Sequence, residues 1–251
     1  MVSIEERLKQ AGVEDPRLCA KILREENLAD EKSVTALIDG EPIQYLVENW
    51  EFYGLPMRMK RGVLIARPDT EILVEKAIEF LKTRTNPTFI DLGCGSGAIT
   101  VAVMKHTGAQ GVALDKNPLA LALTRENAEK NGVAPLIVER DMLCPPDGEF
   151  DAVISNPPYL TGKEMGELSV QVQKEPSDAL YGGEDGLDFY RAIIPLYDKK
   201  IKSGGALLLE IGYQQGQAVA NLCREAGYTD IEILQDYSHN DRVVFCRRNE
   251  K

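Results

Sequence analysis

Residues 89–98 read Phe-Ile-Asp-Leu-Gly-Cys-Gly-Ser-Gly-Ala, and this stretch decides the fold class. The apolar run that ends near Asp91 predicts a β-strand, and the residues that follow Gly97 predict a helix. Glycines between the two allow a sharp turn and leave no Cβ atom in the way of a ligand. A strand, a glycine-rich turn and a helix in this order indicate a nucleotide-type binding loop in an α/β protein.

From residue 70 onward the chain alternates predicted helices and strands. We expect helices over residues 72–81, 97–106, 118–131, 187–202 and 214–226, and strands over residues 88–91, 111–115, 136–139, 151–155 and 206–211. Such alternation predicts a parallel sheet wrapped by helices. The last two predicted strands, residues 229–234 and 242–247, have no helix between them and therefore predict an antiparallel edge.

Two smaller parts precede this alternating region. Residues 1–40 contain short amphipathic segments and predict a small helical N-terminal domain. Residues 41–66 are punctuated by Gly54 and Pro56, which predicts a linker that contains a β-hairpin. The main α/β domain is then expected over residues 67–251.

Composition excludes several classes of protein. Of the 251 residues, 43% are hydrophobic and 27% charged, which is typical of a globular chain. The net charge is −11 and no Lys/Arg run occurs, so we expect no direct contact with nucleic acid. Apolar runs are too short to cross a bilayer and the first ten residues do not resemble a signal peptide, so we expect a cytoplasmic protein without a membrane partner.

Cysteine and histidine usage argues against a metal site. The five cysteines are widely spaced without a Cys-x-x-Cys motif, and the chain has only two histidines. Neither a zinc site nor a disulfide framework is therefore expected.

Acidic residues at predicted strand ends indicate which ligand the glycine-rich loop binds. Asp91 stands where a carboxylate could hold an ammonium group, and Asp115 where it could take both hydroxyls of a ribose. This pair fits S-adenosylmethionine better than a dinucleotide, whose pyrophosphate would be repelled. Asp141 and Met142 follow the next strand and could contact an adenine, or they could be an ordinary turn carboxylate and a space-filling methionine.

The segment Ser-Asn-Pro-Pro-Tyr at residues 155–159 predicts chemistry on a planar nitrogen. The prolines end the strand and hold the loop rigid at the carboxyl edge of the sheet. There the Asn156 side-chain oxygen and the Pro157 carbonyl can accept both N–H protons of an amide, while Tyr159 lies against its plane. Catalysis would then consist of orientation and polar preorganisation.

These two motifs resemble those of class I methyltransferases, and the chain is similar to the HemK/PrmC family of protein-(glutamine-N5) methyltransferases. The resemblance rests on the two motifs and on residues 41–46, 67–71, 175–176, 208–212 and 241–244. It covers the chain from about residue 41 to its end.

The resemblance implies a seven-stranded, Rossmann-like methyltransferase fold with a helical N-terminal domain. It implies that the acceptor is the glutamine in the Gly-Gly-Gln motif of a class I peptide-chain release factor. The residues that it places around S-adenosylmethionine are Gly93, Cys94, Gly95, Ser96, Gly97, Asp115 and Asn156. Around the glutamine it places Asn156, Pro157, Pro158 and Tyr159. Arg67 and Glu71 would shape the rim or bind the partner, or else form an ordinary exposed ion pair.

Three alternatives stay open at the level of the sequence. The same Asn-Pro-Pro-Tyr geometry could serve a methyltransferase for adenine N6 or guanine N2, with Tyr159 stacked on a flipped base. The net charge and the short segment 160–185 argue against it. A non-catalytic binding protein would not need Asn156 and Asp115, and a nicotinamide-dependent reductase is disfavoured by Asp91.

Overall fold

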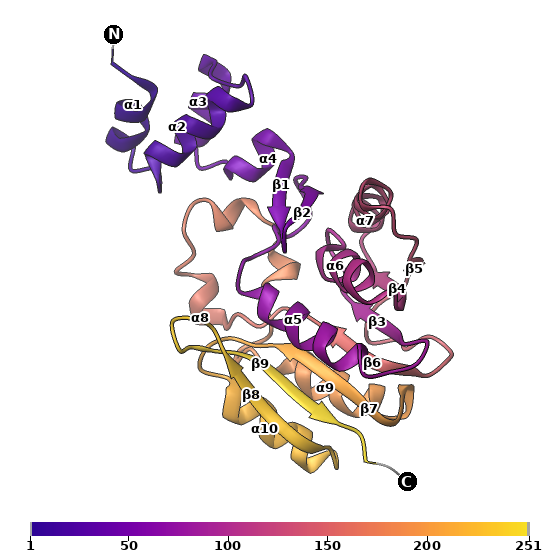
Figure 1. Cartoon of the computed structure of the whole chain (residues 1–251). Helices are drawn as coiled ribbons and strands as arrows, with labels where there is room; N and C mark the ends of the chain where they lie inside the picture. Colours follow the sequence, from indigo (N-terminus) through magenta and orange to yellow (C-terminus); the bar gives the residue numbers. More distant parts are fainter. Residues whose placement is uncertain (1, 250–251) are drawn as a thin grey trace.

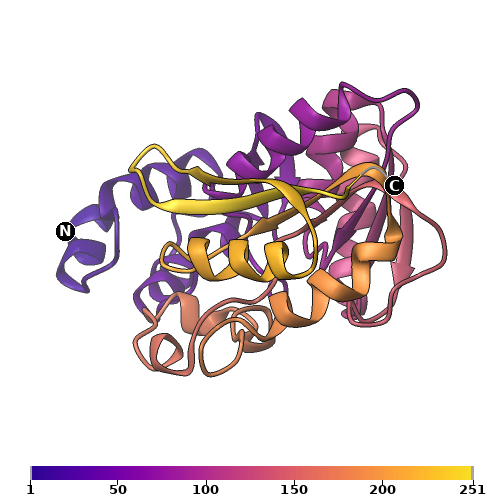
Figure 2. The ribbon, with the colours of Figure 1, turned by 90° about the horizontal axis from the view of Figure 1, so that it is seen from below.

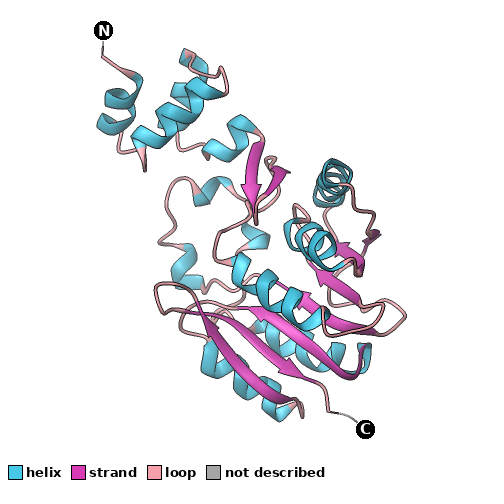
Figure 3. Ribbon diagram, viewed as in Figure 1, coloured by secondary structure: helices cyan, strands magenta, loops and turns pink. Residues whose placement is uncertain are grey.

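The computed structural model describes residues 2–249 of the chain and contains the predicted seven-stranded sheet. Its strand order is β5-β4-β3-β6-β7-β9-β8 (Figures 1 and 3). The strands are β3 (Thr88–Leu92), β4 (Gln110–Asp115), β5 (Leu136–Glu139), β6 (Phe150–Ser155), β7 (Ile201–Glu210), β8 (Thr229–Gln235) and β9 (Asp241–Arg247). Neighbours from β5 to β7 are parallel, and β9 is antiparallel to both β7 and β8. The fold class expected from the sequence is confirmed.

Helices cover both faces of this sheet, as the view along it shows (Figure 2). One face is covered by α5 (Thr70–Leu81), α6 (Ala98–Thr107) and α7 (Pro118–Asn131), the other by α9 (Asp188–Tyr197) and α10 (Gly216–Glu225). Alternation along the strands divides the core between the faces: Ile154 packs with α5 and α6, while Val153 packs with α9. Full burial of such aliphatic side chains contributes roughly 1.5–3 kcal/mol each.

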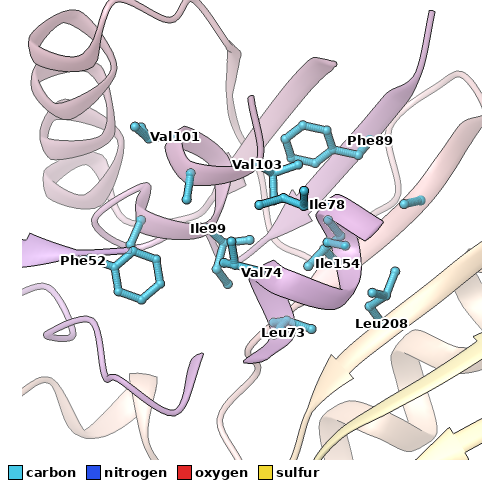
Figure 4. Close-up of a cluster of buried hydrophobic side chains, with 14 of the residues drawn as sticks. Phe52, Leu73, Val74, Ile78, Phe89, Ile99, Val101, Val103, Ile154 and Leu208 are labelled. Atoms are coloured by element: carbon cyan, nitrogen blue, oxygen red, sulfur yellow. The ribbon is translucent and has the colours of Figure 1, made fainter. Parts of the chain in front are cut away.

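The β1–β2 hairpin joins the core on the α5–α6 face. Its strands are β1 (Asn49–Phe52) and β2 (Leu55–Arg58), as the predicted hairpin requires. Phe52 is buried among side chains of α5 and α6 (Figure 4). Asn127 of α7 accepts a hydrogen bond from the Arg58 amide at 2.6 Å and donates to the Arg58 carbonyl at 3.0 Å. The hairpin is therefore fixed to the main domain by apolar and polar contacts.

A small group of helices stands at one end of the molecule (Figure 1). It comprises α1 (Ile4–Gln10), α2 (Pro16–Glu25) and α3 (Glu31–Ile38), followed by the short α4 (Ile43–Val47). These helices share their own apolar cluster, in which Leu8, Leu23 and Leu37 are buried. Helices thus occur within residues 1–40 as predicted, whereas α4 lies in the predicted linker, where no helix was expected. The division of the chain at residues 40 and 66 stays a prediction.

Two adjacent predicted elements are wrong in extent, because the strand expected over residues 206–211 already begins at Ile201. The sequence predicts a helix over residues 187–202, but α9 ends at Tyr197 and a short 3₁₀ turn leads into β7 at Ile201. Ile201 is fully buried and pairs with Phe150 of β6. Burial in the sheet therefore overrides the local helical pattern.

Candidate active site

A cavity opens at the carboxyl edge of the parallel strands, where open α/β sheets bind ligands. Loops after four neighbouring strands contribute to it: Gly93 to Ser96 after β3, Asp115 to Asn117 at the end of β4, Asp141 to Leu143 after β5, and Asn156 and Pro158 after β6. Residues 62–67 and the segment around Pro176 and Asp178 line it as well.

Most of the residues predicted from the sequence meet at this cavity. Those that line it are Arg67, Gly93, Cys94, Gly95, Ser96, Asp115, Asp141, Met142, Asn156 and Pro158. Glu71, Asp91, Gly97, Pro157 and Tyr159 are not among its lining residues. The proposed role of each residue stays a prediction, but the two sequence motifs do face one cavity.

The glycine-rich loop needs its glycines for different reasons. Gly93, Gly95 and Gly97 all have positive φ, at 70°, 54° and 78°. A Cβ atom on Gly97 would lie 2.8–3.0 Å from atoms of Thr124, so this glycine allows α6 and α7 to pack closely. A Cβ atom on Gly95 would meet nothing nearer than 3.9 Å, because that side of the loop is open towards the cavity.

Asp91 lies buried beneath this loop and is not exposed at all. Its Oδ2 accepts hydrogen bonds from the Thr100 amide at 3.1 Å and the Thr100 hydroxyl at 2.6 Å. Its Oδ1 is buried without a hydrogen-bond partner among residues 2–249. Burial raises the pKa of this carboxyl to about 7, against the hydrogen bonds from Thr100 that lower it. The site thus holds an acidic group with one free acceptor oxygen.

Backbone amides hold Asp115 and Asp141, two of the carboxylates that line the cavity. Asp115 accepts from the Asn117 amide through Oδ1 at 2.8 Å and from the Gly95 amide through Oδ2 at 2.9 Å. Burial raises the pKa of Asp115. Asp141 accepts from the Leu143 amide at 2.8 Å. Each carboxylate oxygen has a second lone pair, so both side chains can still accept from ligand hydroxyl or amino groups.

The cationic side chains at the cavity are already paired. Arg67 forms an ion pair with Glu175, and Lys116 lies 3.4 Å from Asp178. Within the described part of the chain, no other Lys or Arg lines the cavity. A pyrophosphate would find no unpaired cation here, which argues against a dinucleotide as the ligand.

Asn156 follows β6 directly and is half-buried at the cavity wall. Its Nδ2 atom donates to the Thr70 hydroxyl at 3.3 Å. Three residues further on, the Tyr159 carbonyl accepts from Gln215 Nε2 at 2.9 Å, and its ring packs on the α9 side of the core. Burial raises the pKa of the Tyr159 phenol, so this group stays neutral.

The structure adds residues to which the sequence reasoning gave no role. Glu175 is a buried carboxylate that accepts from the Ile65 amide at 2.9 Å and pairs with Arg67. It thereby holds the strip of residues 62–67 against the cavity. Glu71 instead accepts from the Tyr53 amide at 2.8 Å, so the exposed Arg67–Glu71 ion pair considered above does not form.

Thr70 is the other residue that sequence reasoning missed. It begins α5, is buried, and lines the cavity beside Asn156. The available signal was its place in the Arg-Pro-Asp-Thr-Glu motif at residues 67–71. Across residues 2–249, no group of three or more Cys, His, Asp or Glu side chains could hold a metal ion, and no helix is long and apolar enough to cross a membrane.

Comparison with known proteins gives a consistent result. A family model described as "Methyltransferase small domain" matches residues 68–179. A release factor glutamine methyltransferase of Moorella thermoacetica is 37% identical over 271 aligned positions, which cover 98% of this chain and 96% of the relative. The protein of the same name from Fusobacterium nucleatum is 38% identical, over 83% of this chain and 60% of the relative.

Solved structures agree at the level of the fold. The crystal structure of a methyltransferase from Pyrococcus furiosus matches with a TM-score of 0.61 and 16% identity. The match covers 79% of this chain and 91% of that protein. At this identity the likeness concerns the arrangement of the chain alone.

Proposed function

The chain belongs to the release factor glutamine methyltransferase family, and from this membership we propose how its site performs the reaction. The enzyme transfers a methyl group from S-adenosylmethionine to the side-chain amide of a release factor glutamine. We place this glutamine in the Gly-Gly-Gln motif of a class I factor, as the sequence resemblance implies. The observation that carries the proposal is that Asn156 and the glycine-rich loop line the same cavity.

The residues of the cavity fit S-adenosylmethionine. Glycine backbone forms one wall, and Gly95 has no Cβ atom to fill the space. Asp115 and Asp141 offer acceptors for ribose hydroxyls and an adenine amino group. The predicted role of Asp91 near the ammonium group is supported by its Oδ1 atom, which has no hydrogen-bond partner among residues 2–249, although Asp91 itself does not line the cavity. When bound, the cofactor supplies an electrophilic methyl group.

Asn156 and Pro157 prepare the amide nitrogen to react. An amide nitrogen is a weak nucleophile, because its lone pair is delocalised into the carbonyl. The Asn156 Oδ1 atom accepts one N–H and the Pro157 carbonyl accepts the other, which directs the lone pair towards the methyl group. With S-adenosylmethionine bound, the amide nitrogen would take up its methyl group and a neutral thioether would remain, while the N–H proton held by the Pro157 carbonyl would pass to water. The predicted contact of the neutral Tyr159 ring with the plane of the substrate amide stays a prediction.

The protein substrate is a release factor, and nucleic acid is not proposed as a direct partner. The net charge of −11 supports this, because phosphate recognition relies on basic surfaces. Family membership does not favour the alternative of a nucleic-acid amino methyltransferase. The cytoplasmic location and the lack of a membrane partner stay predictions from the sequence.

The test is the intact mass of a purified class I release factor after incubation with this protein and S-adenosylmethionine. We expect the factor to gain one methyl group, and a Gln→Ala variant of its Gly-Gly-Gln motif to gain none. Asn156→Ala should leave cofactor binding largely intact and lose most of the turnover. Methylation of the Gln→Ala factor would refute the proposed acceptor, and turnover of Asn156→Ala within a few-fold of the parent would refute the proposed role of Asn156.

A further inference from the structure

Glu210 is a buried carboxylate at the end of β7 that the proposed reaction does not use. Only 2% of its surface is exposed, although a charged side chain is rarely buried unless it is paired. In the sheet register, Leu209 lies beside Ser155, so Glu210 lies beside Asn156, the next residue of the neighbouring strand end. Glu210 is not itself among the residues that line the cavity.

Three side chains form a small hydrogen-bonded group at this position. The Thr70 hydroxyl and the side-chain amide of Asn156 lie beside the Glu210 carboxylate and lower its pKa as hydrogen-bond donors. The Asn156 Nδ2 atom also lies 3.3 Å from Thr70 Oγ1. The Glu210 Oε2 atom is buried and has no hydrogen-bond partner within the described residues. Both neighbours therefore hold the NH₂ end of the Asn156 amide.

The orientation of this amide decides whether the reaction can occur. An asparagine amide has a donor end and an acceptor end, whereas an ionised carboxylate is an acceptor only. With its NH₂ end held by Glu210 and Thr70, Asn156 must direct Oδ1 away from β7, to the side on which it lines the cavity. In the reverse orientation the NH₂ group of Asn156 would face the substrate amide nitrogen. Both groups are hydrogen-bond donors, so no hydrogen bond could form between them.

We propose that Glu210 is a positioning residue which, with Thr70, fixes the side-chain amide of Asn156 with its oxygen towards the substrate nitrogen. The inference rests on the proposed function of Asn156. It extends that function to a residue outside the cavity, one that touches neither substrate nor cofactor. Because a carboxylic acid can donate as well as accept, this device works only while Glu210 is ionised.

The surroundings of Glu210 place its ionisation close to neutral pH. Burial and the nearby Asp69 carboxylate raise its pKa to about 7, against hydrogen bonds from Thr70 and Asn156 and the charge of Arg242. Arg242 on β9 is itself paired with Asp69 at 3.2 Å and Asp236 at 2.9 Å. The remaining titratable groups that face Glu210 are the phenols of Tyr159 and, on α9, Tyr190. Both have raised pKa values and are neutral in this range.

The kinetic test compares the parent enzyme with Glu210→Gln at several pH values. The maximal methylation rate of the parent should fall as the pH drops through about 7, because protonated Glu210 no longer enforces one amide orientation. Glu210→Gln can both donate and accept, so we expect its kcat to be lower by on the order of 10- to 100-fold. It should lose the acidic limb of the profile and keep the KM for the release factor.

Thr70 offers a matched pair of variants. Thr70→Ser keeps the hydroxyl and should retain nearly the parent kcat, whereas Thr70→Val keeps the shape and should lose kcat. Thermal melting and cofactor binding separate these effects from misfolding. A drop in stability without a change in kcat, or equal losses in both Thr70 variants, would show a structural role only.

A second readout does not depend on turnover. With ¹⁵N-labelled asparagine, the side-chain NH₂ signals of Asn156, assigned from Asn156→Ala, should shift with a midpoint near the pKa of Glu210. Glu210→Gln should abolish this titration. If the titration occurs but no release factor is methylated, the proposed function fails and the positioning contact stands. If methylation occurs but the signals do not titrate and Glu210→Gln has the parent kcat, the positioning inference fails alone.

Discussion

The substitution Gly95→Ala tests two properties of the glycine-rich loop separately, namely its left-handed backbone conformation and the open space that it leaves at the cavity. Gly95 has a φ of 54°, and an alanine in this left-handed region costs about 1–2 kcal/mol. For a chain of this size, that lowers the melting temperature by roughly 2–8 °C. The added methyl group would touch no protein atom within 3.9 Å, so no further loss of stability is expected. It would instead occupy space at the cavity.

The same methyl group should weaken cofactor binding much more than folding. Forcing one extra methyl group into a packed contact typically costs about 1–3 kcal/mol. This corresponds to a roughly 5- to 150-fold increase in the Kd for S-adenosylmethionine. Isothermal titration calorimetry on the purified protein measures the Kd, and a thermal melt without cofactor measures the stability.

Gly108→Ala is the matched control for this experiment. Gly108 ends α6 with a φ of 69°, and its Cβ atom would also meet nothing within 4 Å, but it lies far from the lining of the cavity. We expect the same loss of melting temperature and an unchanged Kd. If Gly95→Ala bound the cofactor as tightly as Gly108→Ala, the cofactor would not approach the loop at Gly95 and the assigned cavity wall would be wrong.

Three further predictions concern carboxylates around the site. Asp115→Asn should raise the cofactor Kd by about 10- to 100-fold, because a charged acceptor is lost, and calorimetry showing an unchanged Kd would contradict its ribose role. The pKa of Asp91 is raised from 3.8 to about 7 in the folded state. Between these two pH values the folded state therefore binds more protons than the unfolded state, and the free energy of unfolding of the parent should fall as the pH rises. The free energy of unfolding of Asp91→Asn, measured by denaturant titration, should therefore rise relative to that of the parent as the pH increases from about 4 to about 7. A difference between the two proteins that does not change with pH would refute the raised pKa of Asp91. Glu175→Ala leaves the Ile65 amide and Arg67 without their partner, so we expect the free energy of unfolding to fall by about 1–3 kcal/mol. The lower end of this range is expected, because Arg67 is 35% exposed and its ion pair is screened by solvent. A midpoint of unfolding equal to that of the parent would show that Glu175 does not hold residues 62–67.

The fold could be predicted from the sequence because its signals are local. Asn117 and Pro118 begin α7 and Gly132 ends it, as capping chemistry requires. The carboxyl ends of parallel strands share one edge, so motifs at residues 93–97 and 155–159 were bound to meet there.

The remaining parts of the site depend on contacts that no local pattern encodes. Glu175 lies 110 residues from Ile65 in the chain, and no sequence pattern in either segment predicts the hydrogen bond between them. In the sequence Thr70 looks like an ordinary first residue of a helix, and only the structure shows its hydrogen bond with Asn156. The burial of Asp91 likewise follows from the packing of α6 over β3 rather than from its position before a glycine.

The two borders of the sheet bear on how the protein behaves at high concentration. A straight, unpaired strand is a template on which another chain can add, and so a starting point for aggregation. At one border β5 has only four residues. At the other, β8 is irregular: Asp230 has a φ of 48°, and the pairing of β8 with β9 shifts register on both sides of Glu232 to Leu234. Both edge strands are therefore poor templates for an intermolecular sheet. This protection against aggregation comes from the short length of β5 and the irregular backbone of β8, and not from particular side chains.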